Sequence, residues 1–227
     1  MKIAFYGSSL LSSYWNGAAT YYRGLLRDLA ARGYTTTFYE PDAFDRQKHR
    51  DIEAPDWAEV LVYPASEDAV RKAIAEAGRA DVVVKASGVG VFDDVLLEGV
   101  VAASRPDAIC IFWDVDAPAT LAELRGHRDH PLHRVFPSLD LVFTYGGGPP
   151  VIEAYESFGA RRCVPVYNAL DATTHFPVPA EERFKADLSF LGNRLPDREA
   201  RVEQFFLEPA ARLPERRFLI GGNGWDT

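Results

Sequence analysis

The sequence predicts an α/β protein built on a doubly wound parallel sheet, and two observations carry that prediction. Short apolar runs alternate along the chain with segments whose apolar residues repeat about every 3.6 positions, which is the rhythm of strands and crossover helices. Some runs are apolar without interruption, as at residues 82–84, and such a run suits a strand covered on both faces. Right-handed crossovers then place the strands in one open sheet.

The first units follow this order closely. A strand is expected at residues 2–6, then a polar loop at 7–16 and a helix that ends at Gly33. The apolar face of this helix holds Ala18, Tyr22, Leu25, Leu26 and Leu29. A second strand is expected at 35–39. Residues 41–55 are charged and predict an irregular surface segment, and residues 57–63 fit either a strand or a short helix.

The remaining units repeat the alternation. A helix is expected from Ser66, and an irregular histidine-containing stretch is expected after a helix that begins near Ala117. The other expected elements are strands at 81–85, 108–113, 141–145 and 163–167 and helices at 92–103 and 151–158. Cys110 and Cys163 fall within these strands, where a thiol behaves as a small hydrophobe, and we expect no disulfide between them.

The chain is expected to divide near residue 170. We predict a Rossmann-like first domain at 1–170, a Pro-rich linker at 171–185 and the incomplete start of a second Rossmann-like domain at 186–227. The last segment offers only two strands and one helix, which cannot bury their own apolar faces. We therefore expect further sequence of the second domain, or a second copy of the chain, to cover them.

Composition narrows the classes of partner. The chain has 227 residues, is 47% hydrophobic and carries a formal net charge of −8, with an isoelectric point near 5.2. An acidic protein is a poor match for non-specific binding to nucleic acid or to an anionic membrane. No apolar run approaches the roughly 18 residues of a membrane span, and the first residues fit a strand better than a signal peptide. These features predict a cytoplasmic protein.

Ligands of open parallel sheets bind beyond the carboxyl ends of the strands, so the residues that follow each strand are the site candidates. At the first helix, Asn16 and Gly17 fit either an anion site on free backbone N–H groups or a plain cap with Asn16 as the capping residue. Tyr14 and Trp15 precede them and suit stacking on a sugar or stapling of the loop. Lys85 and Tyr145 follow two other strands and are further candidates for binding.

Two carboxylates follow the strand at 108–113. Asp114 and Asp116 would enter the crevice, where either fits a general base that acts on an acceptor hydroxyl. For Asp116 we favour a cap for the next helix, because an acid before a small residue and Pro118 is a strong helix-start pattern. His127, His130 and His133 lack a completing ligand pattern, and we expect no metal there.

Several cofactor motifs are absent from the sequence. No G-x-G-x-x-G follows the first strand, no Walker lysine is present, and no serine stands in a G-x-S-x-G elbow. In the second domain, Gly192, Asn193 and Arg194 follow a strand and precede a helix. Glycine allows close approach and Arg194 suits a diphosphate, although a surface arginine on a tight turn fits the pattern equally. Residues 221–224 form a second flexible loop.

Four motifs together resemble the CgeB-type (spore maturation protein) glycosyltransferases of the GT-B fold. The motifs lie at residues 13–23, 113–118, 167–177 and 191–194, and the resemblance covers essentially the whole chain. It implies two Rossmann-like domains that face each other across a cleft, a nucleotide-diphospho-sugar as donor, and no metal or other cofactor. By position, Gly17 matches the loop near the donor phosphate or acceptor, and Arg194 matches the basic residue near the diphosphate.

The resemblance has two departures. Related enzymes often carry a histidine where this chain has Asp114 to Asp116, and their acidic donor-binding motif belongs to a later part of the second domain. We therefore expect a glycosyltransferase whose turnover needs further sequence. The alternative is a non-catalytic cytosolic protein that binds a small ligand or nucleotide between two lobes. The candidate catalytic residues are Asp114 and Asp116, and the candidate substrate- or donor-binding residues are Tyr14, Trp15, Asn16, Gly17, Lys85, Tyr145, Gly192, Asn193 and Arg194.

Overall fold

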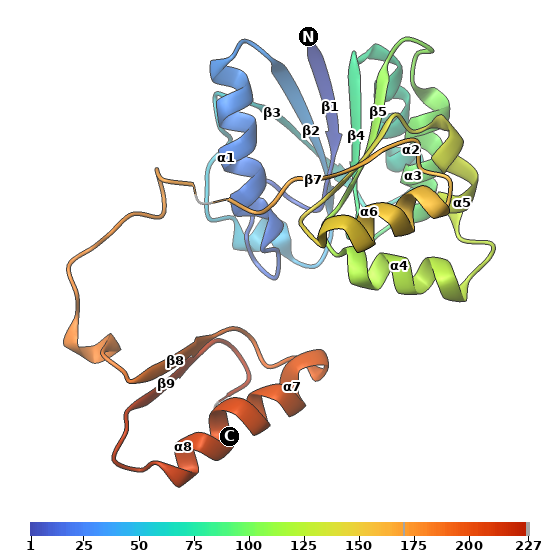
Figure 1. Ribbon diagram of the computed structural model, residues 1–227. Helices are drawn as coiled ribbons and strands as arrows, with labels where there is room; N and C mark the ends of the chain where they lie inside the picture. Colours follow the sequence, from blue (N-terminus) through green and yellow to red (C-terminus); the bar gives the residue numbers. More distant parts are fainter. Residues whose placement is uncertain (170, 226–227) are drawn as a thin grey trace. The chain divides into compact units, whose positions relative to one another are not determined.

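The computed structural model describes residues 1–169 and 171–225, without the side chain of Asp197. Two compact units make up the chain, the first from Met1 to His175 and the second beginning at Phe176. The first unit contains a parallel sheet of seven strands and the second a parallel pair, which confirms the predicted α/β fold class (Figure 1).

In the sheet of the first unit the strands follow the order β3-β2-β1-β4-β5-β6-β7, and every neighbouring pair is parallel. The strands are β1 (Lys2–Tyr6), β2 (Thr35–Asp42), β3 (Glu59–Pro64), β4 (Val82–Ala86), β5 (Ile109–Asp114), β6 (Leu141–Thr144) and β7 (Cys163–Pro165). The order reverses between β1 and β4. A doubly wound sheet forms its ligand crevice at such a switch point.

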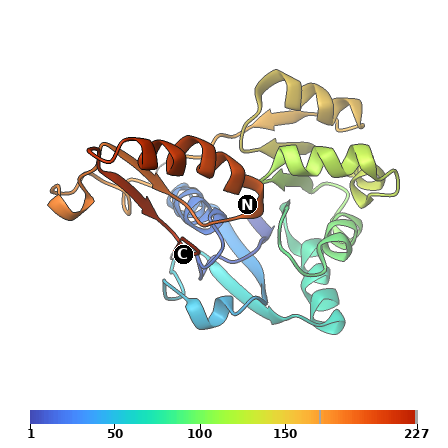
Figure 2. The same cartoon turned by 90° about the horizontal axis from the view of Figure 1, so that it is seen from below.

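Helices cover the two faces of this sheet unequally. The helices of the unit are α1 (Ala18–Ala31), α2 (Glu67–Ala75), α3 (Asp93–Ala103), α4 (Ala117–Gly126), α5 (Pro131–Val135) and α6 (Gly148–Ser157). Tyr22 and Leu26 of α1 pack into one core, whereas α2 to α6 share a second core on the opposite face. Figure 2 shows α1, in blue, apart from the green and gold helices. One face of the sheet therefore depends mainly on α1.

The described residues also form four short 3-10 turns: η1 (Arg46–His49), η2 (Glu76–Arg79), η3 (Phe136–Ser138) and η4 (Glu182–Phe184). The first of them corrects the expectation of an irregular surface segment at 41–55. β2 runs on to Asp42, and the Arg46 side chain is buried, with its guanidinium donating to the carbonyls of Ser8 and Val89. This charged segment is therefore partly buried, because the Arg46 guanidinium donates hydrogen bonds to carbonyls of neighbouring loops.

In three other segments the structure decides between two expected elements or differs from the expected one. Residues 57–63, which fitted either element, form the edge strand β3. The histidine-containing stretch is not irregular throughout, since α5 begins at Pro131, with His130 Nδ1 accepting from the Leu132 N–H. Helix α6 starts at Gly148, three residues earlier than expected. The N–H groups of a first helical turn have no acceptor within the helix, so prolines, which lack an N–H, are tolerated there. Cys110 and Cys163 are buried and free, as predicted.

The second unit pairs β8 (Leu188–Leu191) with β9 (Phe218–Gly221) through a helical crossover. That crossover consists of α7 (Pro196–Val202), a π-helical segment η5 (Glu203–Leu207) and α8 (Glu208–Arg212). Phe206 contacts Phe190 and Phe218, at ring centroid distances of 6.2 and 5.5 Å, and forms a small core. Leu191, by contrast, is 89% exposed. One face of the strand pair is therefore left open to a further covering element.

Candidate functional site

The carboxyl ends of β1, β2, β4 and β5 carry polar side chains that organise the switch-point loops. Glu40, at the end of β2, is fully buried and accepts from Ser9 Oγ at 3.0 Å, from the Leu10 N–H and from Gln47 Nε2. Its carboxylate therefore holds the loop that follows β1. The sequence reasoning missed this residue. Its one visible clue was its position directly after the strand expected at 35–39, at the same edge of the sheet.

Asn16 braces the same loop, and its side chain does not cap α1, so the plain-cap alternative for this residue does not hold. Its amide donates to the carbonyls of Ser9 and Ser12 at 2.9 and 3.1 Å and accepts from Ser8 Oγ at 2.8 Å. The N-cap position is Gly17, which has no side chain to bond. A Cβ built on Gly17 would meet nothing within 4 Å. The start of α1 is therefore open to a close approach.

Tyr14 and Trp15 differ in how they sit beside that opening. The ring of Tyr14 stacks on His49 with centroids 4.1 Å apart, so Tyr14 fastens the loop to η1. Trp15 is 53% exposed and has a left-handed backbone with φ of 49°, which is uncommon for a residue other than glycine. Of the two rings, that of Trp15 has more surface free for stacking on a ligand.

Asp114 is enclosed by hydrogen-bond donors at the end of β5. Its carboxylate accepts from Ser87 Oγ and Thr120 Oγ1, both at 2.9 Å, from the Asp116 N–H at 3.1 Å and from the Tyr155 hydroxyl. Ser87 lies in the loop after β4, Asp116 is the N-cap of α4, Thr120 belongs to α4 and Tyr155 to α6, and Asp114 is fully buried. Asp114 therefore links these elements through hydrogen bonds, and neither of its carboxylate oxygens is exposed to solvent.

Asp116 is exposed, and its Oδ1 accepts from the Ala119 N–H at 3.4 Å as the N-cap of α4. The helix-cap interpretation of this residue is confirmed. This hydrogen bond is long and uses only one of the two carboxylate oxygens. Asp116 also borders a hollow of about 300 Å³ over β4 and β5. Asp116 is thus the carboxylate of the pair that a bound molecule can reach.

Lys85 also borders this hollow, but its charge is already neutralised. Its side chain is 3% exposed, and Nζ lies 2.5 Å from Asp93 Oδ1 and 2.7 Å from the Ala86 carbonyl. Burial lowers the pKa of Lys85, and the attraction of Asp93 partly opposes that shift. The ionisable side chains that line the hollow are Lys85, Asp93, Asp94, Asp116, Glu123 and His130. Carboxylates outnumber cations, which disfavours a phosphate there.

Tyr145 follows β6 and belongs to an aromatic cluster between α1 and the ends of β5 and β6. The ring of Tyr21 lies 4.9 Å from that of Tyr145 and 5.9 Å from that of Trp113, and the Phe143 ring lies 5.1 Å from that of Trp113, all between centroids. The Tyr145 hydroxyl is itself buried. The structure thus places this predicted binding residue inside the cluster rather than on an open wall.

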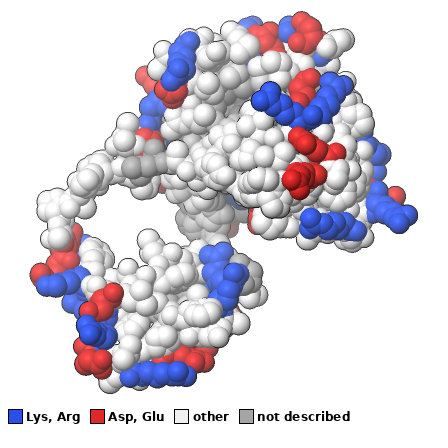
Figure 3. All heavy atoms as spheres, viewed as in Figure 1, with Lys and Arg blue, Asp and Glu red and all other residues white. Residues whose placement is uncertain are grey.

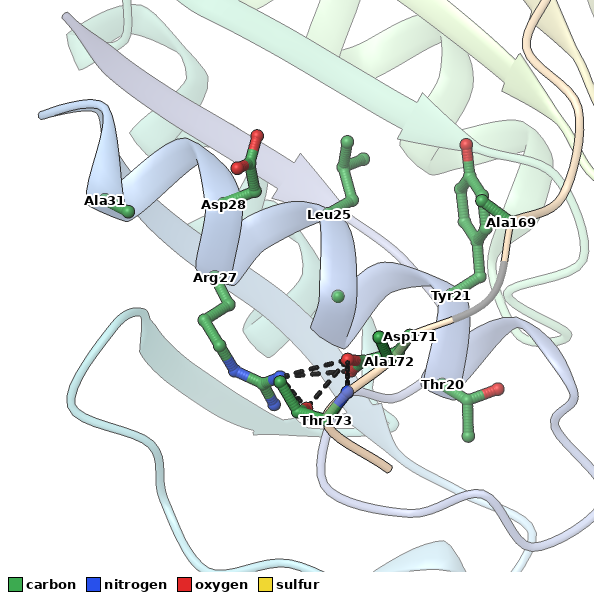
Figure 4. Close-up of a pocket in the computed structure, with 11 residues that line it drawn as sticks. Thr20, Tyr21, Leu25, Arg27, Asp28, Ala31, Ala169, Asp171, Ala172 and Thr173 are labelled. Atoms are coloured by element: carbon green, nitrogen blue, oxygen red, sulfur yellow. Dashed lines mark hydrogen bonds and ion pairs between the residues drawn. The ribbon is translucent and has the colours of Figure 1, made fainter. Parts of the chain in front are cut away.

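A groove that the sequence did not reveal runs along α1, where residues 171–175 lie against the helix. Arg27 Nη1 donates to Asp171 Oδ2 at 3.0 Å and to Thr173 Oγ1 at 2.5 Å (Figure 4). A Cβ on Gly24 would lie 3.3 Å from Asp171, so the small residue permits this contact. The groove encloses about 550 Å³. Residues 171–173, which were expected to be the first residues of the linker, are therefore held against the first unit by hydrogen bonds to Arg27.

Loss of this contact is expected to free residues 171–175. In an Asp171→Ala variant we expect limited proteolysis in this segment to accelerate about tenfold or more, because a hydrogen bond to a charged group contributes roughly 1.5 to 3 kcal/mol. Cleavage sites are read by mass spectrometry. Asp28→Ala, which removes an exposed ion pair with Arg32 on the same helix, serves as the control. Equal cleavage rates in the two variants would contradict the expectation.

In the second unit the turn after β8 is held by the loop after β9. Asn193 Oδ1 accepts from the Asn223 N–H at 2.9 Å, the Trp225 indole donates to the Gly192 carbonyl at 2.7 Å, and the Arg194 N–H donates to Asn223. The Arg194 side chain pairs with Glu199, with Nε 3.0 Å from Oε1. Arg194 therefore has a carboxylate partner that any bound diphosphate would have to replace.

Charge is distributed without a single dominant patch on the face that Figure 3 shows, where Lys, Arg, Asp and Glu side chains are interspersed. Among the described residues, no group of three or more His, Cys, Asp or Glu side chains is arranged to hold a metal ion. Nor does any helix in the described ranges combine the length and apolarity of a membrane span.

Neither a protein-family model nor a curated protein matches the sequence, whereas solved structures do. An α-glucosyltransferase bound to UDP-glucose and DNA with an abasic site aligns over 98% of this chain at 11% identity, with a TM-score of 0.56. Anabaena HepE with UDP-glucose aligns over 99% at 14% identity and 0.55, and a kitacinnamycin glycosyltransferase over 100% at 13% and 0.52. The chain spans 57% of the first, 70% of the second and 66% of the third. The likeness shows a shared Rossmann-like fold.

Proposed function

We propose that this chain belongs to a GT-B glycosyltransferase that uses a nucleotide-diphospho-sugar. The observation that carries the proposal is the fold similarity to glycosyltransferase structures, which extends over 98 to 100% of the chain and includes both units. Two of those structures hold UDP-glucose, which makes a UDP-sugar the first donor to test. The motifs that resemble CgeB-type enzymes point to the same fold family.

For the donor we assign the turn of Gly192, Asn193 and Arg194. Glycine lets the backbone approach a phosphate, and a guanidinium can pair with it through two parallel hydrogen bonds. The bonds of Asn193 and of the Gly192 carbonyl fix the turn before any ligand arrives. Arg194 would exchange Glu199 for the diphosphate. Basic side chain and backbone N–H groups would then hold the leaving group, and the proposal invokes no metal ion.

The donor assignment predicts opposite effects for two substitutions. Arg194→Met should weaken UDP binding by about tenfold or more, since a hydrogen bond to a charged group contributes roughly 1.5 to 3 kcal/mol. Glu199→Gln should leave UDP binding equal or tighter, because it weakens the ion pair with Glu199 that competes with the diphosphate. Isothermal titration of the chain with UDP and UDP-glucose measures both. Unchanged UDP affinity in Arg194→Met would remove Arg194 from the donor site.

For the acceptor we assign the hollow over β4 and β5, with Asp116 as the general base. Its exposed carboxylate can take a proton from an acceptor hydroxyl, which requires only hydrogen-bond reach. The acidic lining suits a neutral or cationic acceptor. The acidic lining disfavours a polyanion, and the chain as a whole has a net charge of −8. DNA, which is present in the complex of the first structural neighbour, is therefore an unfavourable acceptor for this chain.

The Asp116 assignment predicts a loss of rate with little loss of stability. In a chain extended by the further second-domain sequence that turnover is expected to need, Asp116→Asn should lower the rate of sugar transfer by about a hundredfold or more, within the range of general-base effects. The cap of α4 should survive, because asparagine caps as well as aspartate. Transfer is followed by UDP release with a panel of neutral and amino acceptors, and circular dichroism checks the fold. Full activity in the folded variant would exclude Asp116 as the base.

A non-catalytic nucleotide-binding protein is the second candidate. The observation that favours it is the enclosure of Asp114, which leaves Asp116 as the accessible acid of the predicted pair. The two candidates differ in turnover. The test uses a chain extended by the further second-domain sequence that turnover is expected to need. UDP binding together with no UDP release under any donor and acceptor combination would favour the binding protein, whereas steady release that depends on an acceptor would favour the transferase.

A further inference from the structure

One edge of the sheet in the first unit is open. β3 pairs with β2 alone, and among the described residues no backbone group of residues 59–63 makes a hydrogen bond outside that ladder. An exposed edge is a template for another strand, and proteins usually block it with charge, proline or a very short strand. In β3 the charge and the proline stand only at the two ends, at Glu59 and Pro64, and residues 60–63 are Val-Leu-Val-Tyr. The centre of β3 can therefore pair with a further strand.

The opposite edge of the same sheet is better protected. β7 has three residues and ends in Pro165, which has no N–H to donate to a further strand. β3 has six residues, and Leu61 near its centre is 41% exposed. Of the two edges, that of β3 is therefore the one suited to accept another strand.

A hollow of about 530 Å³ lies beside this edge, between β3 and α2. Leu61 and Tyr63 border it from the strand, and a stripe of Asp68, Lys72 and Glu76, four positions apart, borders it from α2 and the start of η2. The charges of this stripe alternate in sign. Lys72 Nζ lies 3.0 Å from Asp68 Oδ2, and both side chains stay accessible, at 78% and 81% exposed. When two such stripes meet antiparallel about a point between Asp68 and Lys72, each lysine faces the aspartate of the other copy, so this surface is complementary in charge to itself.

We propose that a second copy of this chain covers the edge, with the two β3 strands paired antiparallel about a two-fold axis at Leu61. A two-fold pair uses the same surface of both copies, which is what a self-complementary surface serves. Leu61 then faces its own equivalent, and Val60 faces Val62 of the second copy. Glu59 faces Tyr63, so the two Glu59 carboxylates lie at opposite ends of the pairing. The inference is independent of the proposed function.

The position of the axis follows from the residues of the strand. Opposed residues of an antiparallel pair point to the same face of the sheet, and an axis on a residue satisfies this condition. An axis on Val62 would bring Pro64, which has no N–H, into the pairing opposite Val60. An axis on Val60 would oppose Glu59 to Leu61 and would leave Tyr63 outside the strand pair. The axis on Leu61 pairs residues 59–63 and keeps the proline outside.

The mass of the chain in solution is the first test. Sedimentation velocity over a series of protein concentrations should show a species of twice the chain mass of 25.2 kDa, in equilibrium with the monomer. High salt should shift this equilibrium toward the monomer, because exposed charge pairs are screened. A monomer at every soluble concentration would overturn the proposal and would leave the edge of β3 to a strand of a different protein.

Two substitutions locate the contact. Leu61→Lys places two ammonium groups opposite each other at the axis, so the dissociation constant of the dimer should rise by about tenfold or more. Leu191→Lys is the matched control, because Leu191 lies on β8 of the second unit and is 89% exposed. It should leave the dissociation constant unchanged, and circular dichroism checks that both variants fold. A dimer that survives Leu61→Lys would overturn the proposal, and one that Leu191→Lys dissociates instead would place the contact in the second unit.

Cysteine cross-linking tests the register of the pairing independently. Leu61→Cys should form a disulfide-linked dimer on oxidation, because directly opposed residues of an antiparallel pair have Cβ atoms about 4.5 to 5.5 Å apart. Glu59→Cys should not, since its two copies would lie four residues apart, or about 14 Å along the strands. The native Cys110 and Cys163 are buried, so the introduced thiol is the accessible one. Linked dimer from Glu59→Cys and none from Leu61→Cys, on a non-reducing gel, would refute the pairing at Leu61.

Discussion

Replacing Asp114 with alanine is expected to lower the free energy of unfolding of the first unit by about 3 to 5 kcal/mol. The substitution leaves four donors without their acceptor, namely the hydroxyls of Ser87, Thr120 and Tyr155 and the Asp116 N–H. Each buried donor that loses its partner costs roughly 1 to 3 kcal/mol, although neighbouring losses are not additive. Urea unfolding followed by near-ultraviolet circular dichroism measures the change.

Asp116→Ala provides the comparison for this prediction. It removes a single exposed cap at the next turn, so it should cost only about 1 kcal/mol. The difference in the free energy of unfolding between the two variants gives the contribution of the four donors that surround Asp114, apart from the effect of losing a carboxylate at this strand end. An Asp114→Ala variant within about 1 kcal/mol of the parent would show that the surrounding hydroxyls find other partners, and Asp114 would return to the list of accessible candidates.

The fold could be predicted because its cause is local. A strand covered on both faces must be apolar throughout, and an amphipathic helix must repeat its apolar residues each turn. Both patterns can therefore be recognised in a short stretch of consecutive residues. The uncertain segments were those in which the pattern is mixed. The edge strand β3 alternates between exposed and partly buried residues and lies against a single neighbour, which is why residues 57–63 fitted two elements.

The roles of the site residues could not be predicted in the same way, because they depend on distant partners. Tyr155, which donates a buried hydrogen bond to Asp114, lies 41 positions away in the sequence. Asp171, the partner of Arg27, lies 144 positions away. Residue type and strand-end position placed Asp114, Lys85 and Tyr145 at the correct edge of the sheet. Whether each side chain faces a hollow or a buried partner is decided by packing. Lys85 and Asp93 are the exception, since both flank the same strand-to-helix turn.

That pair gives the second large expected effect. Asp93→Ala should destabilise the first unit by about 3 to 5 kcal/mol at neutral pH, because it leaves the Lys85 ammonium buried without its countercharge. Unfolding by urea at a series of pH values between neutral and about pH 10 measures the effect. Glu67→Ala, which breaks an exposed ion pair with Arg71, is the surface control and should cost less than about 0.5 kcal/mol.

The pH dependence of this variant has a definite sign. Burial lowers the pKa of folded Lys85 below its ordinary value of 10.5, whereas the unfolded chain keeps the ordinary value. Between the two values the unfolded state binds more protons, so stability rises with pH. Loss of Asp93 removes the attraction that raised the folded pKa, and the rise in stability should therefore begin at a lower pH than in the parent. A Lys85→Met, Asp93→Ala double variant should recover most of the lost stability and show no such rise, since neither charge remains. If the double variant is as unstable as Asp93→Ala, the cost lies in the lost packing of Asp93, and the buried cation is not its cause.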